Sequence, residues 1–378
     1  MNAVKTIHHS DVVGSMLRPH YLVEARAALQ AAGGADRPAA QAALSEAEDR
    51  AVDEALAIQE DAGVEVVTDG EMRRGAFFEF FFSGMTGMSQ LEGQGITFHR
   101  PNGEAIEIPI SFTLAEQVRA SECPGVQEFK YANSKADREV KVCLPSPGML
   151  WPFWNDQSRQ AYSDPFDLLH DVRDVVADWM RELAAAGCTN IQLDAPELAT
   201  AFADETFREG QLRTRGIDPE RFIEVVTEIV ASLGAIDLPG VTKTMHVCKG
   251  NYAESFLAFG GYDAFAEKVF TLANAFDVYH LEYDDEHSGD FSPLKKLPDD
   301  KVAVLGLVST RWATIEDKDQ LKRRIAEAAQ FHPQEHLAIA TQCGFASGAE
   351  TAEARLFDYE TQAVKLRLVA EVAGEVWG

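Results

Sequence analysis

Short runs of β-branched and apolar residues alternate along this chain with longer stretches in which apolar residues recur every three or four positions. The short runs predict strands at residues 11–13, 64–68, 140–144, 190–193, 241–246, 278–282, 302–307 and 337–341. The longer stretches predict helices, among them residues 38–62, 166–186, 219–233, 317–329 and 350–376. Parallel strands joined by crossover helices give this alternation, and eight such units close a barrel. The pattern therefore predicts an α/β fold of the TIM (β/α)8 barrel type.

The stretch from about residue 75 to residue 138 interrupts that rhythm after the second predicted strand. It begins with an aromatic cluster made of Phe77, Phe78, Phe80, Phe81 and Phe82. Two alternating runs follow, at residues 96–100 and 106–112, and together they resemble a β-hairpin. We expect a hairpin-containing insertion that covers the mouth of the barrel.

An open doubly wound sheet would show the same alternation of strands and helices. Sheets of that kind that bind nucleotides carry a glycine-rich loop after the first strand, and Val13-Gly14-Ser15 is too short for that loop. No internal repeat, low-complexity tract or long Pro/Gly linker divides the chain. We therefore expect one barrel domain over residues 1–378.

The composition limits the location and the partners of the protein. A chain of 378 residues with 46% hydrophobic content can bury a large core, and a formal net charge of −27 opposes binding to nucleic acid or anionic lipid. No apolar run approaches the roughly 20 residues of a membrane-spanning helix, and residues 1–10 lack the features of a signal peptide. Five scattered cysteines make a poor disulfide framework. We expect a cytoplasmic protein with free thiols and no nucleic-acid or membrane partner. A homo-oligomer is one possible state of assembly.

Three residues at predicted strand ends suggest a metal site. His246-Val247-Cys248 places an imidazole and a thiol two residues apart, so both side chains can point the same way near the end of a strand. Cys343 follows the apolar run at residues 337–340 and occupies the same kind of position on the last predicted strand. One nitrogen and two sulfurs suit zinc, and three protein ligands leave the fourth position for a substrate. An H-x-C pair by itself is a weak signal, because either side chain could belong to the core.

The context of these residues resembles the zinc motif of the cobalamin-independent methionine synthase family. The resemblance rests on His246-Val247-Cys248, on Glu282 within residues 280–284, and on Gln342-Cys343-Gly344. It is a resemblance to the family's catalytic C-terminal barrel, it covers nearly the whole chain, and it marks the protein as a short, single-barrel relative. The resemblance implies a Zn2+ cofactor on His246, Cys248 and Cys343, with Glu282 coordinating or approaching the metal when no thiol is bound.

The same resemblance implies the reaction and the thiol substrate. A zinc-bound thiol loses its proton and becomes a nucleophile, so the family likeness implies methylation of a small thiol, homocysteine, to methionine. Ser15 resembles a residue of the loop that holds the homocysteine carboxylate, and Glu71 and Asp194 resemble the two carboxylates that share its ammonium group. The plainer alternatives are a surface ion pair of Glu71 with Arg73 or Arg74, and a structural role for Asp194.

The methyl donor implied by the resemblance is methyltetrahydrofolate or another small donor. In the family a histidine after the seventh strand is associated with protonation of the departing pterin, and Val308 or Ser309 stands there in this chain. Trp151 and Trp154 could stack on a flat donor or could be packing residues, and Arg311 is a candidate for binding an anionic tail.

Three other functions remain open at this point. The epoxyalkane:coenzyme M transferases resemble the same zinc barrel, but their sulfonated thiol needs a cationic pocket, whereas Glu71 and Asp194 suit an ammonium group. A zinc-stabilised binding protein without catalysis would need a fourth protein ligand. A metal-free relative of uroporphyrinogen decarboxylase would have no need of His246, Cys248 and Cys343.

Overall fold

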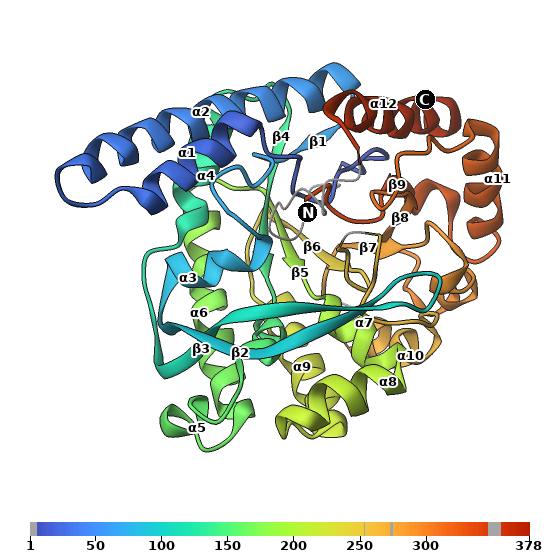
Figure 1. Ribbon diagram of the computed structural model, residues 1–378. Coiled ribbons are helices and arrows are strands. Elements are labelled where there is room, and N and C mark those ends of the chain that lie inside the picture. The colour runs from blue at the N-terminus through green and yellow to red at the C-terminus, as the bar shows by residue number, and fades with distance from the viewer. Residues whose placement is uncertain (1–5, 253, 273–274, 347–356) are drawn as a thin grey trace.

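Seven parallel strands form one curled sheet in the order β1-β4-β5-β6-β7-β8-β9 (Figure 1). The computed structural model describes residues 6–252, 254–272, 275–346 and 357–378, and the strands within these ranges are β1 Val66–Val67, β4 Glu139–Pro145, β5 Asn190–Asp194, β6 Thr242–Val247, β7 Val278–Glu282, β8 Val302–Val308 and β9 Leu337–Thr341. Each strand pairs in parallel with its neighbours in that order. The predicted α/β fold with a parallel sheet is therefore confirmed.

The first predicted strand, residues 11–13, needs a correction, because it does not form a strand. Ser10 makes a single parallel bridge to Ile339 of β9, and the Glu65 amide donates to the Ser10 carbonyl at 3.3 Å. The chain before β1 thus links the last strand of the sheet to the first. The ladder stops there because the Asp11 carboxylate itself accepts the Val12 amide proton, at 2.7 Å, which removes that donor from strand pairing.

Helices flank the sheet on its outer side (Figure 1). The longer ones are α1 His20–Ala31, α2 Arg37–Ala62, α4 Pro124–Asn133, α6 Pro165–Ala185, α7 Pro196–Ala203, α9 Pro219–Gly234, α10 Asp263–Leu272, α11 Lys318–Ala328 and α12 Tyr359–Trp377, and the short ones are α3 Phe80–Gly84, α5 Ser158–Ala161 and α8 Glu205–Phe207. Their starts follow local sequence: Asp164, Asp218 and Asp317 each accept a backbone amide proton as the cap of α6, α9 and α11. The predicted helix at 350–376 begins later, at Tyr359, and residues 350–356 lie outside the described ranges.

An antiparallel pair of long strands, β2 Met85–His99 and β3 Ala105–Ala120, stands apart from the main sheet. Ile96 pairs with Ile108, and the tip is fastened to the loop after β6 by two backbone hydrogen bonds between His99 and Phe256, at 2.8 and 3.0 Å. Near the middle of the pair the ring of Phe112 packs on Phe82, with the centroids 4.3 Å apart. The pair crosses one end of the sheet in Figure 1, so its inner face forms a wall of the space there.

The apolar core lies between the sheet and the surrounding helices. Side chains such as Trp179 of α6, Val226 of α9 and Leu281 of β7 are at most 1% exposed within it. Their burial removes apolar surface from water and so stabilises the positions of the strand ends that carry polar side chains. Within the described ranges, every helix is too short or too polar to traverse a lipid bilayer.

Candidate metal centre

The imidazole and the two thiols predicted as ligands lie together at one end of the sheet. His246 is in β6, Cys248 follows that strand directly, and Cys343 follows β9. Their ligand atoms lie within 4.8 Å of one another, and each residue is at most 4% exposed. Because β7 and β8 separate β6 from β9 in the sheet, only the curvature of the sheet brings these residues together.

The electrostatics of this group fit a bound cation. Neither ring nitrogen of His246 meets an oxygen or nitrogen partner among the described residues. Burial would lower the pKa of His246, but the neighbouring Cys343 sulfur raises it above its usual value. Interaction with Cys343, together with burial, raises the pKa of the Cys248 thiol well above its usual range. Buried polar groups of this kind are costly without a partner, and one imidazole nitrogen with two sulfurs is a donor set that zinc satisfies.

A second buried group, made of Glu71, Cys143 and Asp194, lies at the same end of the sheet, with ligand atoms also within 4.8 Å of one another. Burial raises the pKa of Asp194 to about 7, although Gln192 donates a hydrogen bond to its carboxylate at 2.8 Å. Burial also raises the pKa of Glu71, and the Arg74 guanidinium opposes that shift. Two carboxylates in such a place favour a cationic ligand, because a positive charge would offset their desolvation.

The backbone holds Glu71 in a constrained position. Its φ is 56°, in the left-handed region, and the Asp69 carboxylate accepts its amide proton at 2.8 Å. A Cβ atom on Gly14 would lie only 3.0 Å from both the Glu71 carboxylate and the Cys143 sulfur, so the loop can approach this closely only as glycine. The Arg74 guanidinium lies 3.4 Å from Glu71 in a buried pair, whereas Arg73 pairs elsewhere. The plain alternative for Glu71, a surface ion pair, therefore does not describe its position.

Hydrogen bonds of Ser15 hold the loop around Gly14 and Ser15 against the loop that carries Cys343. The Phe345 amide donates to the Ser15 carbonyl at 2.8 Å, and the Ala346 amide donates to its hydroxyl at 3.3 Å. A Cβ atom on Gly344 would overlap the Ser15 hydroxyl. This close approach places a hydroxyl next to the Cys343 segment.

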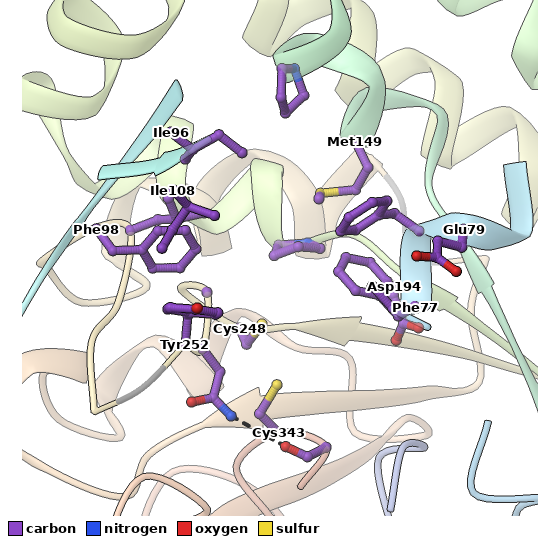
Figure 2. Close-up of a pocket in the computed structure, with 18 of the residues that line it drawn as sticks. Phe77, Glu79, Ile96, Phe98, Ile108, Met149, Asp194, Cys248, Tyr252 and Cys343 are labelled. Atoms are coloured by element: carbon purple, nitrogen blue, oxygen red, sulfur yellow. Dashed lines mark hydrogen bonds between the residues drawn. The ribbon is translucent and has the colours of Figure 1, made fainter. Parts of the chain in front are cut away.

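Most of these groups face one cavity of about 380 Å³ (Figure 2), although Cys143 and Arg74 do not line it. Its lining includes seven of the predicted site residues: Ser15, Glu71, Trp151, Asp194, His246, Cys248 and Cys343. The other walls come from residues 76–79, from the β2/β3 pair and from η3 Pro147–Phe153. Figure 2 shows the Cys248 and Cys343 sulfurs below the side chains of Ile96 and Ile108. His246, Cys248 and Cys343 therefore share one space with the predicted thiol-binding residues, whereas Glu282, also predicted at the metal, does not line it.

A family model described as the catalytic domain of cobalamin-independent synthase matches residues 13–358. The chain belongs to the cobalamin-independent methionine synthase family. It is 33% identical over 376 residues to the uncharacterized protein YxjH of Bacillus subtilis (strain 168). That match covers 99% of this chain and 96% of YxjH. It is 26% identical to a methionine synthase of Saccharolobus solfataricus, over 89% of this chain and 87% of that enzyme. The resemblance found in the sequence is confirmed, and membership in this methionine synthase family supports an enzyme of the methyltransferase class.

Solved structures show the same fold. A Listeria monocytogenes protein described as a vitamin-B12 independent methionine synthase superposes with a TM-score of 0.72 at 24% identity, covering 98% of both chains. A B12-independent methionine synthase from Shewanella sp. W3-18-1, in complex with selenomethionine, gives a TM-score of 0.71 at 18% identity and the same coverage. At 24% and 18% identity, the likeness shows that this methionine synthase family member has the same fold as these two proteins.

Glu282 lies outside the group of His246, Cys248 and Cys343 in this member of the methionine synthase family. One of its carboxylate oxygens accepts hydrogen bonds from Arg311, at 2.8 Å, and lies 2.9 Å from the His287 ring nitrogen. The other oxygen accepts the backbone amide proton of Lys249, at 2.7 Å. Glu282 thereby fixes the residue that follows Cys248, and it would have to break these bonds to reach a metal.

Arg311 and Trp154, expected near the donor, do not line the cavity, whereas Trp151 does. The Arg311 side chain is fully buried and donates to both oxygens of Asp284 at 2.7 Å, in addition to Glu282. Its charge is therefore satisfied within the protein and is not offered to a ligand. Sequence reasoning missed this ion network, and its signal was the concentration of acidic residues at 282–286 directly after an apolar strand.

Proposed function

We propose that the protein is a zinc-dependent methyltransferase that methylates the thiol of homocysteine, giving methionine, with methyltetrahydrofolate or another small molecule as the methyl donor. The observation that carries this proposal is the meeting of one imidazole and two thiols, within 4.8 Å, in a cavity that also contains the buried carboxylates of Glu71 and Asp194. The first set suits zinc and the second suits an ammonium group, and homocysteine brings a thiol and an ammonium in one small molecule.

His246, Cys248 and Cys343 are the proposed zinc ligands. Zinc bound there would lower the pKa of a coordinated substrate thiol so that it is deprotonated at neutral pH. We leave Glu282 out of this ligand set because both of its carboxylate oxygens are engaged by the protein. The proposed role of Glu282 and Arg311 is to hold the backbone beside Cys248, so that the two sulfurs keep their spacing.

The remaining proposed contacts orient the amino-acid end of homocysteine. Its ammonium would lie between Glu71 and Asp194, whose raised pKa values a neighbouring cation would bring back down. Its carboxylate would accept a hydrogen bond from the Ser15 hydroxyl beside Cys343. Holding both ends of the molecule fixes the direction in which the thiol faces the open part of the cavity, and such orientation lowers the entropic part of the barrier.

The chemistry of the cavity speaks against the alternative thiol, coenzyme M. Its sulfonate would need a lysine or arginine, and among the described residues that line the cavity there is neither. A zinc site without catalysis is also disfavoured, because the described part of the chain supplies three members to this group and not four.

Zinc X-ray absorption spectroscopy tests the proposal directly. We expect zinc-loaded protein to show two sulfur ligands when free and three after addition of homocysteine, with no change after addition of coenzyme M. Glu71→Gln/Asp194→Asn protein, which keeps the zinc ligands, is expected to need a much higher homocysteine concentration for the same change. Absence of the third sulfur at saturating homocysteine would refute the proposed function.

A further inference from the structure

The part of the cavity that homocysteine leaves free must hold the methyl donor. The whole cavity has a volume of about 380 Å³, and it would have to accommodate homocysteine as well. Ligand pockets commonly measure about 300–1,000 Å³ for a single small molecule. The space left beside homocysteine therefore favours a small donor.

The walls of this part are aromatic and apolar. They include Phe77, Phe98, Phe112, Trp151 and Phe153. Ile96 and Ile108 of the β2/β3 pair face the space from one side in Figure 2, and Met149 faces it from above. Aromatic faces attract cations through the electrostatics of the ring, by about 0.5–2 kcal/mol each depending on desolvation.

The charges on these walls are of one sign. Apart from Glu71 and Asp194, the charged side chain on the described lining is Glu79, whose carboxylate accepts the Gly75 amide proton at 2.8 Å. Figure 2 places Glu79 beside Phe77, on the side of the cavity where Asp194 lies. An anionic donor would be repelled here and would lose hydration without gaining a partner. A cationic donor would gain a carboxylate and several aromatic faces.

Proton-bearing groups on the described lining include the hydroxyl of Tyr252 and the carboxyl groups of Glu71, Glu79 and Asp194, whereas the wall formed by the β2/β3 pair and the end of β8 carry no acidic group. Val308, at the end of β8, is a buried apolar residue, and the lining residues contributed by the β2/β3 pair are Ile96, Phe98 and the segment 108–112, none of which carries an acidic proton. A donor whose leaving group departs as a neutral molecule needs no such proton. The sign of the wall charges favours a cationic donor, and such a donor can depart as a neutral molecule.

We propose that the methyl donor is a small sulfonium ion, an inference that rests on the proposed function of the same site. The homocysteine sulfur forms a bond to the methyl carbon, the bond from that carbon to the sulfonium sulfur breaks, and its electron pair stays on the departing sulfur. The donor leaves as a neutral thioether. The proton lost by the homocysteine thiol passes to solvent, so one cation is consumed and one proton is released.

Deuterated trimethylsulfonium, which carries no other functional group, is a direct probe. Zinc-loaded protein is incubated with homocysteine and trimethyl-d9-sulfonium, and in parallel with 5-methyltetrahydrofolate as its monoglutamate and triglutamate. We expect d3-methionine by mass spectrometry, an equal amount of deuterated dimethyl sulfide by gas chromatography, and no methionine from either folate. Methionine from a folate without transfer from the sulfonium would overturn the inference, and so would a lack of transfer from every donor.

The zinc X-ray absorption spectrum recorded with homocysteine shows whether a negative result refutes only the sulfonium donor or also the proposed function. A third sulfur on zinc without transfer from the sulfonium leaves thiol activation standing and removes only the donor class. Absence of the third sulfur refutes both.

Glu79→Gln tests the wall charge. It keeps an oxygen for the Gly75 amide and removes the negative charge, and Glu122→Gln is the matched control because Glu122 is exposed and does not line the cavity. We expect Glu79→Gln to raise the KM for trimethylsulfonium roughly fivefold, with the homocysteine KM unchanged. Calorimetric titration of metal-free protein with trimethylsulfonium is expected to show the same loss of affinity. Equal affinities for the two variants would overturn the role of Glu79 and with it the charge argument for a cationic donor.

Discussion

Replacing Arg311 with methionine removes the guanidinium that lies among Glu282, Asp284 and Asp285 while keeping a side chain of similar length. Arg311 donates to Glu282 at 2.8 Å and to Asp284 at 2.7 Å, and the side chains of all three residues are fully buried. Losing one partner of a buried ion pair leaves an uncompensated charge and costs about 3–5 kcal/mol. We expect the free energy of unfolding of Arg311→Met to fall by about 4 kcal/mol at pH 8.

The pH dependence of this loss has a definite sign. Burial raises the pKa of Glu282, but Arg311, His287 and Lys249 together outweigh burial and hold that pKa below its usual range, so these interactions stabilise the fold above the usual pKa of a glutamate. Burial already raises the pKa of Asp284 to about 6 even with Arg311 present. Without the guanidinium both carboxyl groups would bind protons at higher pH. The destabilisation is therefore expected to be largest at pH 8 and smaller at pH 6, where protonation relieves the buried charge.

Urea unfolding of zinc-loaded protein, followed by circular dichroism at both pH values, measures this effect. Arg323→Met is the control, because Arg323 is 71% exposed and its removal should change stability by no more than about 0.5 kcal/mol. Since Glu282 accepts the amide proton of Lys249 beside Cys248, zinc affinity of Arg311→Met should also drop about 10–100-fold in a chelator competition. Unchanged stability at pH 8, or a loss that grows toward pH 6, would refute the reasoning.

Three further variants test other parts of the structure. Cys343→Ala should lose all turnover and most of its bound zinc, measured by elemental analysis. Its circular dichroism should remain that of the folded protein, because Cys343 lies at a strand end and not in the core. Gly14→Ala should raise the homocysteine KM about tenfold, since its Cβ would lie 3.0 Å from the Glu71 carboxylate; an unchanged KM would show that this contact is unimportant. Burial raises the pKa of Glu197 to about 8, so the folded state binds a proton that the unfolded state releases, and stability should fall by about 1 kcal/mol per pH unit between pH 6 and 8. Glu197→Gln should remove this slope from urea unfolding curves, and an identical slope in both proteins would count against a buried neutral carboxyl group.

The sequence determined the elements that depend on local pattern. Six of the parallel strands coincide closely with apolar runs, and α6, α9 and α11 begin within one residue of the predicted positions because proline and aspartate cap signals lie beside them. His246, Cys248 and Cys343 could be placed together from sequence, since the carboxyl ends of parallel strands meet at one end of a barrel. The strand at 11–13 was predicted wrongly because a side-chain hydrogen bond of Asp11, which no periodicity reveals, replaced the strand ladder.

Only the tertiary structure decided which charges are satisfied by the protein and which face the cavity. Glu282 and Asp284 lie at the end of β7 and just after it, whereas Arg311 lies in a separate segment after β8. The pairing of Arg311 with both carboxylates removes all three from the space where a ligand could meet them. Trp151 and Trp154 are equivalent in sequence pattern, yet only Trp151 lines the cavity. The apolar wall from the β2/β3 pair likewise depends on where its tip docks, at Phe256. Periodicity records which face of an element is buried, but partners distant in the chain are chosen by packing and by the cost of leaving a buried charge unpaired.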